Sequence, residues 1–152
     1  MKGKYVALAV FVLTAFMASE LCGAAWKFIG FNRYRDAFYL DEETVEHVSG
    51  GTVQIWAKLT VAKKSLFRRA MKKDLERVPK KIEEVKYLKM KEELDCQAQK
   101  IRHLELIYYD YHDRVLLRTV NPKAKWNPVV PGSLWHELLS TSCGKLSGTT
   151  SE

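Results

Sequence analysis

The sequence has few of the groups that enzymes use for chemistry. Its 152 residues contain no glycine-rich phosphate loop, no paired-carboxylate arrangement and no nucleophile motif. The four histidines are not spaced as metal ligands. Asp110, His112 and Asp113 come nearest to a cation site, but their segment is more typical of a solvated hairpin turn. These absences disfavour an enzyme, and neither a cofactor nor a metal is expected.

Long apolar runs are also lacking. Val6–Ala18 is the longest candidate, and it is too short to cross the ~30 Å hydrocarbon core of a bilayer. Basic residues precede this run and small residues follow it at 23–25, which is typical of a secretory signal peptide. We therefore predict a signal peptide at 1–25 that is cleaved on export. An uncleaved anchor and lipidation of Cys22 are the alternatives.

Cysteine is scarce, with three in the chain. Cleavage removes Cys22 and leaves Cys96 and Cys143, and two cysteines in an oxidising compartment indicate one disulfide. Closing a loop of that length destabilises the unfolded chain by roughly 4 kcal/mol in the chain-entropy model. The alternative is a catalytic thiol beside His103 or His136, which the even count of mature cysteines disfavours.

Acidic residues are outnumbered along one stretch. From Ala62 to Lys91, twelve lysines and arginines stand against four carboxylates, a net charge of +8 in a chain whose net charge is +7. Leu66–Val78 has apolar residues at helical spacing, with Ser65 to cap the start and Pro79 to end the pattern. The sequence predicts an amphipathic basic helix here. Its basic residues are Arg68, Arg69, Lys72, Lys73 and Arg77.

The predicted basic helix has two interpretations. Its apolar side must be covered by the sheet or by a second subunit, so a homodimer is one outcome. Its basic side is either a solvated surface or a binding site for polyanions outside the cytoplasm, such as lipopolysaccharide, sulfated glycans or lipid headgroups. Nucleic acid is not expected as a partner, because the chain is exported and the basic run has few aromatic residues.

The remaining patterns are mostly those of β-strands. Thr52–Val61 alternates apolar and polar residues over ten positions, which is the strongest strand signal. Residues 80–95 are ambiguous, since their lysine and glutamate content favours a helix whereas the following sequence favours a strand. A helix is predicted at 134–143, ending at Gly144. Further strands are predicted at 26–31, 36–40, 43–48, 97–110 and 114–120.

Three tryptophans outside the first strand carry separate expectations. Trp56 lies on the polar side of its strand, where it is either an exposed anchor or packed beneath a loop or the basic segment. Trp126 and Trp135 are expected in the core beneath the C-terminal helix.

The order of motifs resembles the bacterial surface-adhesin protein E family. The motifs begin with a tryptophan that opens the mature chain and an aromatic strand ending in Asp41. They continue with "VQIWAKL", an "LDC" that enters a long strand, "YYDYHDRVLL", a "W-x-P-V-x-PGS" connector and a C-terminal helix ending in Cys143. The likeness extends over residues 26–144. The basic segment at 63–91 has no counterpart among these motifs, and residues 145–152 are expected to be a disordered tail.

The resemblance implies an α+β fold and a binding function. The fold would be a single antiparallel sheet of about six strands, with the C-terminal helix packed across it and tethered by a Cys96–Cys143 disulfide. The function would be that of an exported adhesin-type protein, in the periplasm or on the outer-membrane surface of a Gram-negative bacterium. With the basic helix, the expected partner is an extracytoplasmic macromolecule or an anionic glycan or lipid. A periplasmic enzyme or an envelope accessory protein is the alternative.

Overall fold

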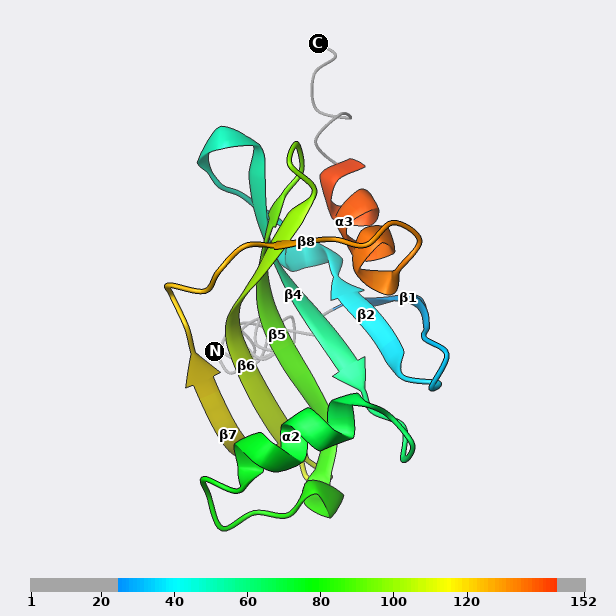
Figure 1. Ribbon diagram of the computed structural model, residues 1–152, viewed down its shortest axis with the longest axis vertical. Coiled ribbons are helices and arrows are strands. Elements are labelled where there is room, and N and C mark those ends of the chain that lie inside the picture. The colour runs from blue at the N-terminus through cyan, green and yellow to red at the C-terminus, as the bar shows by residue number, and fades with distance from the viewer. Residues whose placement is uncertain (1–24, 145–152) are drawn as a thin grey trace, which may run out of the picture.

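The computed structural model describes residues 25–144, which form one antiparallel sheet with two helices (Figure 1). The expected signal-peptide cleavage and the expected disordered tail at 145–152 lie outside these residues. The six main strands are arranged in the order β1-β2-β4-β5-β6-β7. They are β1 Trp26–Phe31, β2 Ala37–Asp41, β4 Thr52–Thr60, β5 Val85–Asp95, β6 Lys100–Asp110 and β7 Val115–Val120.

Short elements complete the sheet and its connections. Two-residue strands pair with the inner strands, β3 (Glu46–His47) with β4 and β8 (Asn127–Pro128) with β6. Single 3₁₀ turns occur at Glu42–Thr44, Ser49–Gly51 and Ile82–Glu84. The strand expected at 43–48 is therefore reduced to β3, because the first of these turns occupies its beginning.

The alternation seen in the sequence of β4 places its apolar residues in the core. Val53, Ile55, Ala57 and Leu59 are fully buried, whereas the residues between them face the other side of the sheet. Both helices, α2 (Phe67–Leu75) and α3 (Leu134–Gly144), cover the core side (Figure 1). The hydrophobic core thus lies between the sheet and this helical layer.

Residues 80–95 are largely strand. Val85, Leu88, Met90 and Leu94 of β5 are buried in the core, and β5 pairs with both β4 and β6. The expected helical insert at 63–91 is therefore too long, since residues 85–91 belong to the sheet. Cross-strand pairing and burial of one side outweigh the helix propensity of lysine and glutamate here.

Helix α2 begins at a buried carboxylate. Asp36 accepts hydrogen bonds from the Ser65 hydroxyl (2.6 Å) and the Ala62 amide (2.8 Å), and the Ser65 oxygen accepts the Phe67 amide (3.0 Å). Ser65 therefore accepts the amide of the first helical residue, although the N-cap position itself is Leu66. Asp36 fixes this contact against the turn between β1 and β2.

The apolar side of α2 is narrower than its sequence suggested. Met71 and Leu75 are buried against the sheet of the same chain, which supplies the covering surface that the helix requires. Leu66, which was expected on this side, precedes the helix and is 52% exposed. Ala70 is also exposed, and the helix ends at Leu75 rather than at Val78.

Helix α3 is held to the sheet by packing and by a covalent bond. Leu138 and Leu139 are buried, and Cys143 is bonded to Cys96 at the end of β5, with their Cα atoms 5.8 Å apart. A Cβ atom at Gly30 would lie 2.9 Å from the Leu134 side chain, so glycine permits the close approach of β1 and α3. The fold expected from the resemblance, including this tether, is confirmed.

The two tryptophans expected beneath α3 differ in position. Trp135 packs edge-to-face on Phe38, with ring centroids 5.2 Å apart, and contacts the core. Trp126 is half-buried outside the core and lies under the guanidinium of Arg102, 4.6 Å from its ring centroid. Trp126 precedes the short strand β8 on the far side of β6 from α3, so the prediction for this residue was wrong.

Candidate functional site

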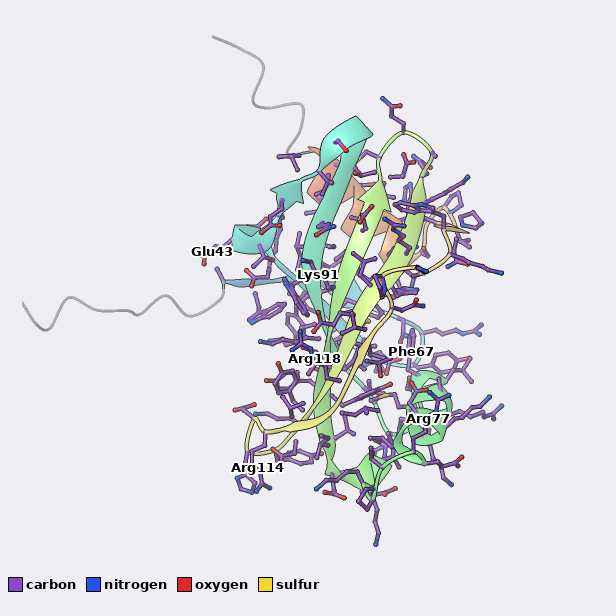
Figure 2. The ribbon with its side chains drawn as sticks, turned by 90° about the vertical axis from the view of Figure 1, so that its left-hand side faces the viewer. Glu43, Phe67, Arg77, Lys91, Arg114 and Arg118 are labelled. Atoms are coloured by element: carbon purple, nitrogen blue, oxygen red, sulfur yellow. A yellow bond between two sulfur atoms is a disulfide. The ribbon has the colours of Figure 1, made fainter. Side chains whose placement is uncertain are left out.

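The first candidate is the α2 basic surface, which comprises Arg68, Arg69, Lys72, Lys73 and Arg77. Four of these side chains are exposed. Arg68 is the exception, since its side chain is only 23% exposed and lies 3.9 Å from the Glu83 carboxylate. Within the described chain, no carboxylate lies within ion-pair distance of the other four. Figure 2 shows Phe67 and Arg77 on the helical side of the molecule.

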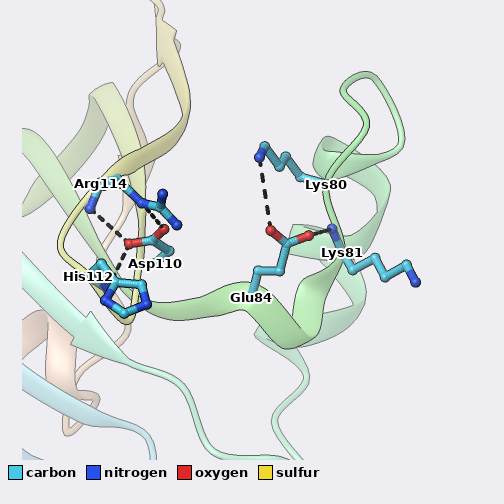
Figure 3. Close-up of polar contacts among 6 residues, drawn as sticks. All are labelled: Lys80, Lys81, Glu84, Asp110, His112 and Arg114. Carbon is cyan, nitrogen blue, oxygen red and sulfur yellow. Dashed lines mark hydrogen bonds and ion pairs between the residues drawn. The ribbon is translucent and has the colours of Figure 1, made fainter.

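Beyond the helix the charge is mixed, since three lysines and three glutamates line the space that follows it. A hollow of about 610 Å³ separates the end of α2 from the following turn, and Lys72, Lys80 and Lys81 line it. Lys80 lies 4.0 Å from Glu84, whose carboxylate also accepts the Lys81 amide (2.9 Å, Figure 3). These contacts hold the turn in shape while the lysine ammonium groups remain at the surface.

The second candidate is the open face, by which we mean the side of the sheet opposite α2 and α3. In Figure 2 it faces away from α2, on the side of Glu43 and Arg114. No helix of the described chain covers it. Aromatic side chains from five strands lie on it, and five of them are half-buried: Trp26, Tyr39, Trp56, Tyr87 and Tyr109.

Lysine ammonium groups lie over these rings. The Lys58 Nζ atom is 4.7 Å from the ring centroids of both Trp26 and Tyr39. The Lys89 Nζ atom is 5.3 Å from those of Trp26 and Tyr109. Such contacts between a cation and a ring contribute about 0.5–2 kcal/mol each. The two lysines therefore share the Trp26 ring.

Burial and like charge act on the groups of the open face. Burial lowers the pKa of Lys58, and the nearby positive charges of Lys89 and Lys86 lower it further. Burial also raises the pKa of Tyr87 to about 12, together with its hydrogen bond to Asp113. Two hollows of about 360 and 280 Å³ open beside these residues, and Trp26 and Lys89 line both.

Trp56 lines the smaller of these hollows. It is half-buried on the open face, so it is neither a fully exposed anchor nor covered by the basic segment, which lies on the other side of the sheet. The sequence indicated that Trp56 and Lys58 share a side of β4. It gave no sign of Lys89, because that neighbour depends on the pairing of β4 with β5.

The third candidate is a groove of about 340 Å³ between α2 and α3 on the helical side. Phe67, Met71 and Trp135 form part of its wall, and His103 reaches it from β6. The His103 Nδ1 atom is 2.7 Å from the carboxylate of Glu92, which is fully buried. Burial raises the pKa of Glu92, and the hydrogen bond with the Glu92 carboxylate raises the pKa of His103.

The turn at 110–113 is a closed structural unit (Figure 3). The Asp110 carboxylate accepts hydrogen bonds from the amides of His112 (2.8 Å) and Arg114 (2.9 Å), and from the Arg114 Nε atom (2.8 Å). Although burial by itself raises the pKa of Asp110, these bonds outweigh it and lower that pKa to about 2. The Asp110 carboxylate therefore makes its hydrogen bonds within the turn itself.

Residues 25–144 contain neither a metal-binding cluster nor a membrane-spanning helix. No group of three or more histidine, cysteine, aspartate or glutamate side chains in this range could hold a metal ion. None of its helices is long and apolar enough to cross a bilayer. The described part of the chain thus offers surfaces and hollows lined by lysine, arginine and aromatic side chains.

The family model described as surface-adhesin protein E matches residues 26–144. The chain belongs to the surface-adhesin protein E family. The matched range runs from the first residue of β1 to the last of α3, and it includes the connection that carries α2. No curated protein matches the chain.

Solved structures of Haemophilus influenzae protein E share the fold. One is 13% identical, has a TM-score of 0.52 and covers 85% of this chain and 91% of its own. Another, from a non-typeable strain, is 13% identical with a TM-score of 0.54, and the match covers 84% of this chain and 80% of that one. At this identity the likeness establishes the sheet and helix arrangement alone.

Membership of the family makes this chain an adhesin-type surface protein, which acts outside the cytoplasm. Its general role is to bind other molecules. This agrees with the scarcity of catalytic groups in the sequence.

Proposed function

We propose that this adhesin binds polyanions through the α2 basic surface. The observation that carries the proposal is the group of four exposed cations on one short helix and the turn that follows it, Arg69, Lys72, Lys73 and Arg77, with no carboxylate of the described chain at ion-pair distance. Met71 and Leu75 anchor the helix in the core, so the charges are presented on a fixed support. Clustered positive charges attract polyanions and release their counterions on binding.

The proposed partner is an anionic polymer or surface outside the cytoplasm, with sulfated glycans and lipopolysaccharide as the main classes. Lysine and arginine side chains at successive turns of a helix contact neighbouring anionic groups along a chain. Such binding has little dependence on the identity of the polymer but depends strongly on salt. We expect heparin binding to weaken sharply between about 50 and 200 mM salt.

The test is retention on a heparin column. Arg69, Lys72, Lys73 and Arg77 are replaced together by glutamine, which keeps helix propensity and removes four charges. Arg68 is left unchanged because it is partly buried beside Glu83. We expect the variant to elute at much lower salt than the parent, with unchanged circular dichroism and melting temperature.

A matched control separates this surface from net charge. Arg33, Lys100, Lys123 and Lys125 are exposed and lie outside α2, so their replacement by glutamine removes the same charge elsewhere. The control should elute close to the parent. Equal losses in both variants would mean that α2 is only a solvated helix surface.

A further inference from the structure

Two lysines on the open face occupy an unfavourable arrangement. Lys58 of β4 and Lys89 of β5 are direct cross-strand partners. Like charges directly opposite each other on one side of a sheet are destabilising. Both side chains are half-buried, which reduces the water that screens them.

Nearby carboxylates do not relieve this repulsion. Among the described residues, none lies within ion-pair distance of Lys58 or Lys89. Asp41, which lines the smaller hollow, accepts the Glu43 amide (3.3 Å). Three other carboxylates of this side are paired with other cations: Asp113 with Lys86 at 3.1 Å, Glu93 with Arg102 at 2.8 Å and Glu105 with Arg118 at 2.6 Å.

Both lysines lie against the same ring, that of Trp26. Each ammonium is about 5 Å from the ring centroid. The two hollows of about 360 and 280 Å³ adjoin this ring, with Tyr87 in one and Tyr109 in the other. Each hollow is near the lower end of the volumes of small-ligand sites. Aromatic walls and a pair of cations therefore converge on one place.

We propose that the open face around Trp26 binds an acidic sugar, a carbohydrate whose ring carries a carboxylate or sulfate group. The acidic group lies between Lys58 and Lys89 and neutralises their repulsion. The C–H side of the sugar ring packs on Trp26 and the neighbouring tyrosines, which present an apolar surface with a polar edge. The adjoining hollow accommodates the next sugar of a chain.

Charge argues against a second copy of the protein as the occupant. A two-fold symmetric dimer brings the same patch of each subunit together. Around Lys58 and Lys89 it would oppose lysine to lysine, and the two carboxylates that line the hollows, Asp41 and Asp113, already have partners within the chain. A flat lipid surface is also a poorer match, because Trp26, Trp56, Tyr87 and Tyr109 line hollows, although Phe28 beside Tyr39 is 48% exposed.

This proposal goes beyond the α2 basic surface and does not depend on it. The two sites lie on opposite sides of the sheet, so one can be removed without the other (Figure 2). Their ligands also differ in one respect. The α2 basic surface requires only dense negative charge, whereas the open face requires a ring that can stack as well as an acidic group.

The test is calorimetric titration of the exported protein with a hyaluronan hexasaccharide, which has carboxylates but no sulfate. Lys58 and Lys89 are replaced together by glutamine, and Trp26 is replaced by leucine in a second variant. We expect each change to weaken binding at least tenfold. The variant loses cation–ring contacts as well as the lysine repulsion, so the circular dichroism and melting temperature of each variant are measured and binding is compared well below the lowest melting temperature, which excludes unfolding as the cause.

The four-glutamine α2 variant is the matched control and should bind the hexasaccharide as the parent does. Short polyphosphate and a single-stranded oligonucleotide are titrated in parallel, and both should bind more weakly at the open face. The proposal is overturned if the parent does not bind the hexasaccharide or if the lysine variant binds it unchanged. It is equally overturned if the Lys58/Lys89-dependent binding is as strong for polyphosphate or the oligonucleotide. Heparin retention by the α2 variants is read separately, so failure of either proposal can be recognised.

Discussion

At the scale of single residues, Glu92 and His103 form a polar pair that reaches into the hydrophobic core. Glu92 has a fully buried side chain, and its Oε1 atom has no hydrogen-bond partner among the described residues. Its Oε2 atom contacts the His103 ring, which is 53% exposed and packs edge-to-face on Trp135. Burial disfavours the charged carboxylate and raises the pKa of Glu92 from 4.5 to about 7.

The pair predicts a specific pH dependence. A raised pKa means that the folded state holds its proton more tightly than the unfolded state. The stabilising contribution of Glu92 is therefore complete below pH 4.5 and is lost as the pH rises to about 7. His103, whose pKa is raised above 6.5, acts in the same direction at higher pH. We expect the pair to lose roughly 2 kcal/mol of stabilisation between pH 5 and 8.

Urea unfolding at several pH values tests this prediction. Glu92→Gln removes the titrating group, so the difference in unfolding free energy between parent and variant should change steadily from pH 5 to pH 8. Glu43→Gln alters an exposed carboxylate and serves as the control, with a flat difference expected. A flat difference for Glu92→Gln as well would show that the pair does not titrate in this range.

At the scale of elements, α3 depends on its covalent attachment. It has only 11 residues, and a helix of this length is marginal unless it is packed. The disulfide closes a loop with a sequence separation of 47 between Cys143 of α3 and Cys96 at the end of β5. It therefore limits the freedom of the unfolded chain as well as the position of the helix.

Loss of this bond is expected to destabilise the protein substantially. Cys143→Ser should lower the unfolding free energy by roughly 2–5 kcal/mol in denaturant titrations. Reduction of the parent with dithiothreitol should give a similar loss and should not further affect the variant. Thiol titration of the oxidised parent should detect no reactive thiol in the folded domain. A reactive thiol there would contradict the prediction.

The elements that could be predicted from sequence are those whose pattern is unbroken. β4 alternates without interruption, and the apolar residues of α3 lie on one side, so both were identified correctly. β5 was ambiguous for a physical reason. Leu88, Met90 and Leu94 alternate, but Glu92 occupies the core position between them and disguises the strand. The hydrogen bond with His103 allows a glutamate at this core position, and that bond depends on tertiary structure.

The candidate sites also differ in how far they depend on local sequence or on tertiary structure. The α2 basic surface depends on residues of α2 and the turn directly after it, so its spacing was evident in the sequence. Even there, the partial burial of Arg68 depends on Glu83 across a turn. The pairing of Lys58 with Lys89 depends on register between two strands separated by α2 and its connections. Local periodicity carries no information about such a register.

At the scale of the whole molecule, the sheet separates two surfaces of different character. The helical side carries the α2 basic surface, and the other side combines aromatic rings with lysines (Figure 2). An adhesin with this arrangement can contact partners on both sides at once. Simultaneous contacts raise the overall strength of attachment without a tighter individual site.

Export is the whole-molecule prediction that begins from the sequence. The short apolar run and the small residues at 23–25 predict cleavage after Ala24 or Ala25. Mass spectrometry of the protein exported by its host should find Ala25 or Trp26 at the N-terminus. Trp26 is the first residue of β1, so cleavage at this point leaves the sheet intact. Retention of Met1 or a lipid on Cys22 would contradict the prediction.

The disulfide also determines how an attached adhesin would carry mechanical load. A pull applied to the chain beyond Cys143 passes through the sulfur atoms to Cys96, and so enters the sheet at β5 rather than through α3. β5 is hydrogen-bonded on both sides, to β4 and β6, so the tension is shared between two neighbours in the middle of the sheet. Residues 97–142 carry no load while the bond is intact. The extension of roughly 160 Å that this segment could add when unfolded requires the bond to be reduced first. Redox conditions at the cell surface would thereby set the length of the tether.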